Sequence, residues 1–328
     1  MSNNPTVSSD QIAAASQTIG RIRSEIAKAV VGQDSILDQV LIALLASGHV
    51  LIEGVPGLGK TLLVRAIAKT FNGTFSRIQF TPDLMPSDVT GHAMYDMKSE
   101  SFKIRKGPIF TNLLLADEIN RAPAKTQAAL LEVMQEQQVT IEGKPLKLAP
   151  PFMTLATQNP IEQEGTYPLP EAQLDRFLLK VMINYPEQQD EYQLVHNVTS
   201  HQVGDAINVD EIHAIVGPED IIQLQKIAAE LTVDNRVSEY AVNITRQTRD
   251  WPGITVGAGP RGGIALIRAG RAAALLNGHD FVTPDDIKEI AVAALRHRIV
   301  LSPEMEIEGQ TPDSILFALL ESVPAPRI

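Results

Sequence analysis

One segment of the chain has the residue types of a loop that holds nucleotide phosphates. Its sequence is Gly54-Val55-Pro56-Gly57-Leu58-Gly59-Lys60-Thr61. The glycines would let backbone N–H groups close around a polyphosphate, the lysine could reach the β and γ phosphates, and the threonine hydroxyl suits Mg²⁺. A helix that begins here would add the positive end of its dipole. The segment therefore predicts a site for a nucleoside triphosphate.

Two adjacent carboxylates, Asp117 and Glu118, follow the apolar run 113–116. Asp117 could hold Mg²⁺, directly or through water, and Glu118 could orient or deprotonate an attacking water. Taken alone, the pair could be an acidic turn after a buried strand. The phosphate loop upstream favours the catalytic interpretation.

Two further polar side chains close later parts of the pattern. Asn159 could position the water or sense the γ phosphate, because open α/β sheets place ligands at the carboxyl ends of their strands. An Asn before a proline, here Pro160, is also typical of a plain turn. Arg176 precedes the last predicted strand, where a surface ion pair with Asp175 or Glu171 is the alternative to a functional role.

Five short segments are predicted to be the strands that position these groups. They are residues 49–52, 74–80, 113–116, 152–157 and 177–183. Helical patterns between them imply parallel β-α-β units. We therefore expect an α/β fold with a five-stranded parallel sheet sandwiched by helices.

The remaining patterns divide the chain into three parts. Residues 1–30 form a helical lead, and 31–186 form the nucleotide-binding core with two hairpin inserts, at about 84–106 and 139–148. Beyond residue 186 we predict no strand. Residues 187–328 are expected to be a linker and a smaller all-α domain, with helical patterns at 221–231, 239–250, 264–276 and 287–298.

Composition limits the classes of function. The 28 basic and 39 acidic residues give a net charge of -11, which argues against general nucleic-acid binding. The absence of cysteine excludes disulfides, thiolate metal sites and thiol catalysis. No apolar run reaches the ~18 residues of a membrane span, and the start lacks a signal-peptide pattern. We expect a cytoplasmic protein without a membrane span.

Together these motifs resemble those of the AAA+ ATPases in their order and spacing, and most closely those of the MoxR family. The stretches that carry the resemblance are the phosphate loop and residues 79–84, 86–88, 107–110, 115–123, 157–160, 169–177 and 259–261. The resemblance covers roughly residues 30–298. It implies a P-loop AAA+ core with a helical lid.

The resemblance also implies a role for each matching position. Asp117 and Glu118 resemble the Walker B pair, Asn159 resembles sensor 1, Arg176 the arginine finger, and Arg261 the sensor 2 arginine of the lid. Gly259 departs from the pattern, because many relatives have Ser there. The expected ATP contacts are Val31, Gly32, Gly54, Pro56, Gly57, Leu58, Gly59, Lys60, Thr61, Leu62 and Asp117, with Thr61 and Asp117 also holding Mg²⁺.

An arginine finger acts in the site of the neighbouring subunit, so the family implies a homo-oligomeric ring, commonly a hexamer. Nucleotide state would set the lid angle through Arg261. The implied activity is ATP hydrolysis coupled to remodelling or maturation of a protein client, often a von Willebrand factor A domain protein and often during metal or cofactor insertion. The two hairpins resemble inserts that handle the client, although plain solvated hairpins are equally consistent with the sequence.

Three other functions stay open. The chain could be the ATPase subunit of a magnesium-chelatase-like complex, which shares this AAA+ branch. It could be a nucleotide-gated scaffold without hydrolysis, although Lys60, Asp117, Glu118 and Arg176 argue against that. Nucleic-acid translocation also occurs in this branch, and the acidic balance disfavours it.

Overall fold

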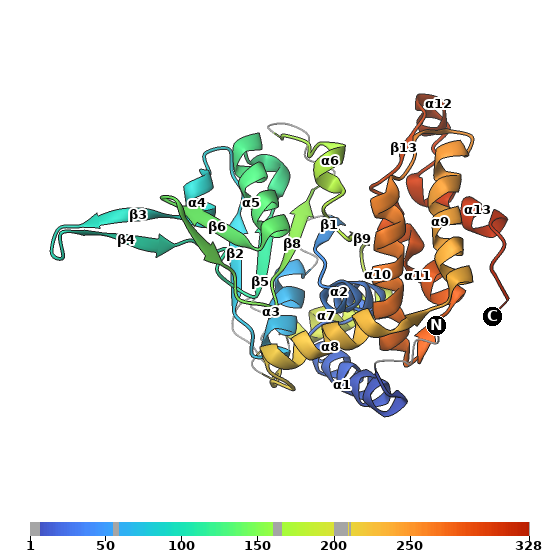
Figure 1. Ribbon diagram of the computed structural model, residues 1–328, viewed down its shortest axis with the longest axis horizontal. Helices are drawn as coiled ribbons and strands as arrows, with labels where there is room; N and C mark the ends of the chain where they lie inside the picture. The colour runs from blue at the N-terminus through green and yellow to red at the C-terminus, as the bar shows by residue number, and fades with distance from the viewer. Residues whose placement is uncertain (1–6, 55–58, 160–165, 200–208, 210, 328) are drawn as a thin grey trace.

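The computed structural model describes residues 7–54, 59–159, 166–199, 209 and 211–327. Its centre is a five-stranded parallel sheet in the order β2-β5-β8-β1-β9 (Figure 1). The strands are β1 (Val50–Gly54), β2 (Phe75–Gln79), β5 (Leu113–Asp117), β8 (Met153–Gln158) and β9 (Leu179–Ile183). Each predicted strand ends within two residues of the observed one, and the predicted α/β class is confirmed.

Helices cover both faces of the sheet. On one face lie α1 (Ser9–Ala27), α2 (Asp34–Leu45) and α3 (Lys60–Thr70), and on the other lies α5 (Ala124–Glu136). Val50 and Ile52 of β1 enter the core on the first face, whereas Leu51 enters the core on the second. Strands buried on both faces are apolar at successive positions. This burial explains the apolar runs 50–52 and 113–116, whereas the edge strand β2 is only partly buried and contains polar residues.

Two hairpins interrupt the alternation of strands and helices. The longer one, β3 (Gly91–Asp96) and β4 (Ser101–Lys106), follows α4 (Pro86–Thr90) and projects away from the body (Figure 1). The shorter one, β6 (Gln138–Ile141) and β7 (Lys144–Lys147), connects α5 with β8. Both hairpins lie where the sequence predicted them.

The chain beyond β9 is mainly helical. Its helices are α7 (Gln188–Thr199), α8 (Pro218–Glu230), α9 (Asn235–Asp250), α10 (Pro260–Asn277), α11 (Pro284–Leu295), α12 (Pro303–Ile307) and α13 (Pro312–Ser322). Short strands that we did not predict also occur: β10 (Thr232–Val233) pairs with β12 (Phe281–Val282), and β11 (Ile254–Val256) with β13 (Val300–Leu301). Strands of two or three residues are too short to show a period-two pattern. In the described part of the chain, no helix is both long and apolar enough to cross a bilayer.

Helix α1 joins the start of the chain to both parts of the fold. Ser8 caps it in a capping box with Gln11. Its apolar stripe packs against α3 of the core and against α8 and α10 of the helical part. Because α1 packs against both parts, its contacts do not assign it to either one. The predicted domain boundaries at residues 30 and 186 therefore stay predictions.

A core substitution tests whether α1 unfolds with the rest of the molecule. Ile26 is completely buried, so Ile26→Ala should lower the free energy of unfolding by about 2–4 kcal/mol, measured by urea denaturation. Ala13→Ser, on the exposed side of α1, should change it by less than about 0.5 kcal/mol. Equal stability of the Ile26→Ala and wild-type proteins would show that α1 is not part of the cooperative unit.

Candidate functional site

The described ends of the phosphate loop lie where β1 ends and α3 begins. Gly59 precedes α3 with a φ of 72°, in the left-handed region that glycine adopts without strain. Lys60 begins the helix, and its Nζ donates a hydrogen bond to the carbonyl oxygen of Gly54 at 2.7 Å. Thr61 and Leu62 follow in the first turn of α3. The other predicted loop contacts, Pro56, Gly57 and Leu58, lie outside the described residues.

Lys60 is a half-buried cation with acidic side chains around it. Burial lowers the pKa of Lys60, and the carboxylates of Asp117, Glu118 and Glu53 oppose this effect. Because the desolvation is the largest contribution, a further anion beside Lys60 would favour its charged form. The environment of Lys60 therefore fits a polyphosphate ligand.

The hydroxyl of Thr157 orients both predicted Walker B residues. Thr157 Oγ1 donates to Asp117 Oδ1 at 2.6 Å and accepts a hydrogen bond from the Glu118 backbone N–H at 2.9 Å. Glu118 has a φ of 56° and a ψ of 50°, a left-handed conformation that costs a non-glycine residue free energy. We had not identified Thr157 as a site residue, because its role depends on the register of β8 against β5.

Two residues of the edge strand β2 reach the same carboxylates. Arg77 Nη2 pairs with Asp117 Oδ2 at 2.6 Å, and Gln79 Nε2 donates to Glu118 Oε2 at 2.7 Å. Glu118 also pairs with Nε of Arg121, in the short helix η1 (Ile119–Arg121), at 3.2 Å. Residues two apart on a strand lie on one face. That spacing was the only signal in the sequence for a shared role of Arg77 and Gln79.

Asn159 follows β8 directly and is buried. Since β8 lies between β5 and β1, the strand ends that precede Glu118, Asn159 and the phosphate loop are neighbours at the carboxyl edge of the sheet. The structure thus brings together the described parts of the predicted phosphate loop, Walker B pair and sensor 1 position. Pro160 lies outside the described residues.

The segment Val31-Gly32-Gln33, which resembles the family's adenine-contacting segment, approaches α7 at Gly32. Gly32 has a φ of 70°, and a Cβ atom added there would lie 2.6 Å from the side chain of Asp190. Only glycine satisfies both conditions. Helix α7 follows β9, which pairs with β1 so that Ile183 lies opposite Gly54. The segment therefore lies on the same side of the molecule as the phosphate loop.

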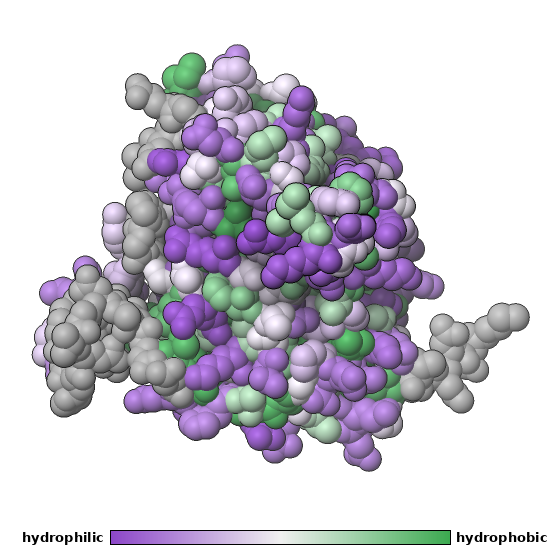
Figure 2. Space-filling view, turned by 90° about the vertical axis from the view of Figure 1, so that its left-hand side faces the viewer, coloured by the Kyte–Doolittle hydropathy of each residue, from purple (hydrophilic) through white to green (hydrophobic). Residues whose placement is uncertain are grey.

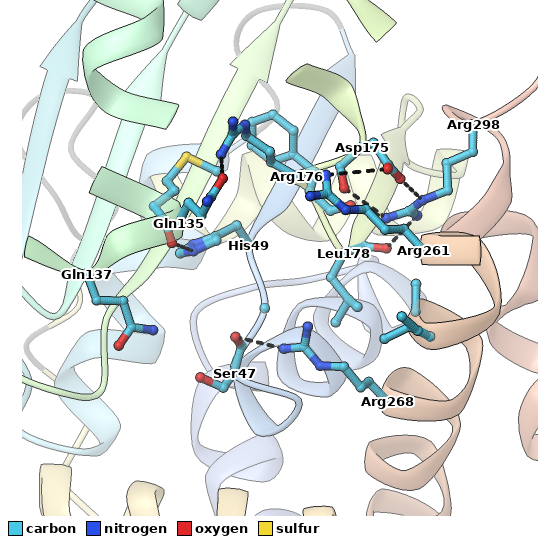
Figure 3. Close-up of a pocket in the computed structure, with 15 residues that line it drawn as sticks. Ser47, His49, Gln135, Gln137, Asp175, Arg176, Leu178, Arg261, Arg268 and Arg298 are labelled. Carbon is cyan, nitrogen blue, oxygen red and sulfur yellow. Dashed lines mark hydrogen bonds and ion pairs between the residues drawn. The ribbon is translucent and has the colours of Figure 1, made fainter. Parts of the chain in front are cut away.

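Arginines gather around a separate cavity of about 380 Å³ (Figure 3). The arginines that line it are Arg176, Arg261, Arg268 and Arg298. Arg176 follows the short helix α6 (Glu171–Leu174), and Arg261 lies in the first turn of α10. The cavity also contains His49, whose pKa burial lowers to about 4, so His49 is neutral at pH 7 and adds no charge.

Asp175 organises this arginine cavity (Figure 3). Its carboxylate pairs with Nε of the buried Arg298 at 2.7 Å and with Nη1 of Arg261 at 3.6 Å. Arg176 donates instead to the side chain of Gln135 at the end of α5. The alternative of an Arg176 ion pair with Asp175 or Glu171 is therefore not what the structure shows.

The arginine cavity and the phosphate loop lie at opposite ends of β1. His49 lines the cavity, and Gly54 is five residues further along the chain, which is about 16 Å in a strand. Arg176 and Arg261 therefore do not reach Lys60 of the same chain. A lid arginine that senses the nucleotide of its own subunit would have to lie near Lys60. Arg261 does not, so the structure gives no direct contact through which nucleotide bound to one subunit would set the angle of that subunit's own lid.

The predicted metal ligands fit Mg²⁺ by their chemistry. Thr61 and Asp117 offer a hydroxyl and a carboxylate, and Mg²⁺ prefers oxygen ligands and usually takes one or two carboxylates together with substrate phosphates. Within the described residues, no cluster of three or more His, Cys, Asp or Glu could hold a metal ion.

Comparisons with known proteins agree with this arrangement. The family model of the ATPase family associated with various cellular activities (AAA) matches residues 49–179, and the AAA lid domain model matches residues 246–317. Chaperone MoxR1 of Mycobacterium tuberculosis is 41% identical over an alignment that covers 99% of this chain and 86% of the relative. This chain belongs to the MoxR family of AAA+ ATPases.

Other relatives extend the agreement to both ends of this MoxR-family chain. Protein MoxR of Methylorubrum extorquens is 32% identical over 93% of this chain and 94% of its own length. A crystal structure of a protein from Cytophaga hutchinsonii superposes with a TM-score of 0.89 at 40% identity, covering 97% of this chain and 98% of that one. The chain is an ATP-hydrolysing enzyme with a helical lid, as the motifs indicated. The roles of individual residues stay predictions.

A threonine-to-valine pair on β8 tests the function of Thr157. Thr157→Val keeps the shape of the side chain and removes the hydrogen bonds to Asp117 and Glu118, so the rate of ATP turnover should fall about 10- to 100-fold. Thr154→Val on the same strand is the matched control, because Thr154 Oγ1 is buried and has no hydrogen-bond partner within the described structure. Steady-state ATPase assays would contradict the assignment if both variants turned over ATP equally.

Proposed function

We propose that this ATPase cleaves ATP at a site completed by two copies of the chain, and that the cycle remodels a protein client. The observation that carries this proposal is the division of the predicted catalytic groups between the two edges of the sheet. The nucleotide-binding groups lie at the carboxyl edge, and Arg176 and Arg261 lie at the other. A single copy therefore does not bring Arg176 or Arg261 to its own phosphates, and the guanidiniums that do lie at its carboxyl edge, Arg77 and Arg121, are paired with Asp117 and Glu118.

Within one subunit, Lys60 and Thr61 would hold the phosphates, and Asn159 and Glu118 would orient the attacking water. Two hydrogen bonds fix the position of Glu118 before substrate binds: its backbone N–H donates to the Thr157 hydroxyl, and its carboxylate accepts from the Gln79 amide. Mg²⁺, when held by Thr61 and Asp117, would neutralise charge on the β and γ phosphate oxygens. Such preorganised charges stabilise the transition state because they need no rearrangement during the reaction.

The neighbouring subunit would add the missing guanidinium. Arg261 is more than half exposed, and Arg176 lines the same open cavity. An arginine finger is worth about 10³ to 10⁵ in rate. Contacts of one edge with the opposite edge of the next copy are head-to-tail, and such contacts close into rings. We propose a hexameric ring on the basis of the family resemblance.

The projecting β3–β4 hairpin supports a protein client. It exposes Met97 and Phe102, and the rings of Tyr95 and Phe102 stack edge to face at 5.3 Å. Figure 2 shows the face from which the hairpin projects as mainly hydrophilic, with separate small hydrophobic areas. An aromatic arm on a polar surface suits contacts with another protein. Within the MoxR family we propose that the client is a von Willebrand factor A domain protein in the cytoplasm, and that its maturation includes insertion of a metal or cofactor.

Mixing two inactive variants tests the shared site. Arg176→Ala should bind ATP normally and lose turnover by about 10³-fold or more, and Glu118→Gln should also bind ATP without cleaving it. In mixed assemblies, an intact Glu118 faces an intact Arg176 at some interfaces, so turnover should reappear. Differently tagged variants would prove by co-purification that the subunits mix. Mixed complexes that stay inactive would contradict a site shared between copies.

A further inference from the structure

The lid contains a second hollow, a groove of about 580 Å³ between α9 and α10. We call it the arginine groove. Its floor is aliphatic, and Val242 and Ile264 are 50% and 58% exposed there. Its rim is cationic: the arginines that line it include Arg246, Arg268 and Arg271. An exposed apolar surface rimmed by polar groups is typical of a contact site for another protein.

The arginines of the groove differ in how they are held. Arg268 donates to the carbonyl oxygens of Ala46 and Ser47, at 2.6 and 3.1 Å, and so ties α10 to the end of α2. Arg271 Nε is buried and has no hydrogen-bond partner in the described structure. Burial lowers the pKa of both arginines. A partner that brings carboxylates would pair with the guanidinium groups that line the groove.

The arginine groove is continuous with the arginine cavity. Ile264 and Arg268 line both, and α10 carries Arg261 at its start and Arg271 ten residues later. Ten helical residues span about 15 Å. A neighbouring subunit that presents its phosphates to Arg261 would therefore also cover the groove.

An acidic and aromatic segment, residues 185–192, follows the carboxyl end of β9, whereas the arginine groove adjoins the cavity at the amino-terminal ends of the strands. Tyr185 and Tyr192 are 72% and 71% exposed, and Glu187 and Glu191 are exposed beside them. The segment begins two residues after β9, whose last residue lies opposite Gly54. Tyr192 lies in the second turn of α7, two residues after Asp190, whose side chain packs beside Gly32.

We infer that the arginine groove of one copy receives the segment 185–192 of the next copy. This inference rests on the proposed shared site, because it assumes the same head-to-tail contact. Tyrosine rings would pack on Val242 and Ile264, and the carboxylates would pair with Arg246 and Arg271. The groove is cationic and the segment is acidic, so the two surfaces are complementary in charge. Because the whole chain is acidic, with a net charge of -11, this complementarity also determines which faces of two copies meet.

Cysteine cross-linking tests the contact, because the natural chain contains no cysteine. A chain with Val242→Cys and Tyr192→Cys, treated with a short bismaleimide and a non-hydrolysable ATP analogue, should give covalent dimers and larger species. Phe317→Cys replaces Val242→Cys in the control, because Phe317 is similarly exposed but lies on α13, outside the groove. The control chain should stay monomeric on a denaturing gel.

Charge exchange gives an independent measurement. Arg246→Glu and Glu191→Arg should each raise the protein concentration at the midpoint of assembly about tenfold or more, measured by sedimentation velocity. The double variant should restore assembly, and Lys226→Glu, an equal charge change on the exposed side of α8, should leave it unchanged.

The outcomes separate this inference from the proposed function. Cross-links together with rescue by the double variant support the contact. Assembly without cross-links, or cross-links only between two copies of Val242→Cys, would overturn the contact even if mixed Arg176 and Glu118 variants recover turnover. Cross-links without that recovery would support the contact and overturn the shared catalytic site.

Discussion

In a parallel sheet all strands end at the same edge, and this constraint determines what a single copy of this ATPase can do. Groups that follow strands, such as Glu118 and Asn159, meet at one edge, and groups that precede strands meet at the other. Arg176 precedes β9 and therefore lies at the amino-terminal ends of the strands, whereas Lys60 follows β1 and lies at their carboxyl ends. The division of the predicted catalytic groups follows from this topology.

The lid is joined to its own core by a buried arginine. Arg298 lies just beyond α11, and it donates to the Asp175 carboxylate and to the carbonyl oxygens of Phe177 and Leu178. A buried guanidinium is costly unless its donors are satisfied, and these acceptors satisfy it. The same Asp175 contacts Arg261. Asp175 therefore connects the lid to the core at the arginine cavity.

The sequence predicted those features that depend on local pattern. The buried strands are continuous apolar runs, and the ends of the phosphate loop and the Walker B carboxylates lie where their motifs indicated. Features that depend on register or packing were not predictable. The link from Thr157 to Asp117 needs the pairing of β8 with β5, and the contacts of Arg77 and Gln79 need that of β2 with β5. The position of Arg261 beside Asp175 depends on how the lid packs, and no motif encodes that packing.

The account rests on the claim that one subunit alone lacks a complete catalytic site. The most direct measurement is the turnover per subunit as a function of protein concentration at saturating ATP, with the assembly state followed in parallel by sedimentation. The account predicts a very low rate for the monomer and a steep rise that coincides with assembly. A turnover per subunit that stays constant down to concentrations where the protein is monomeric would contradict it.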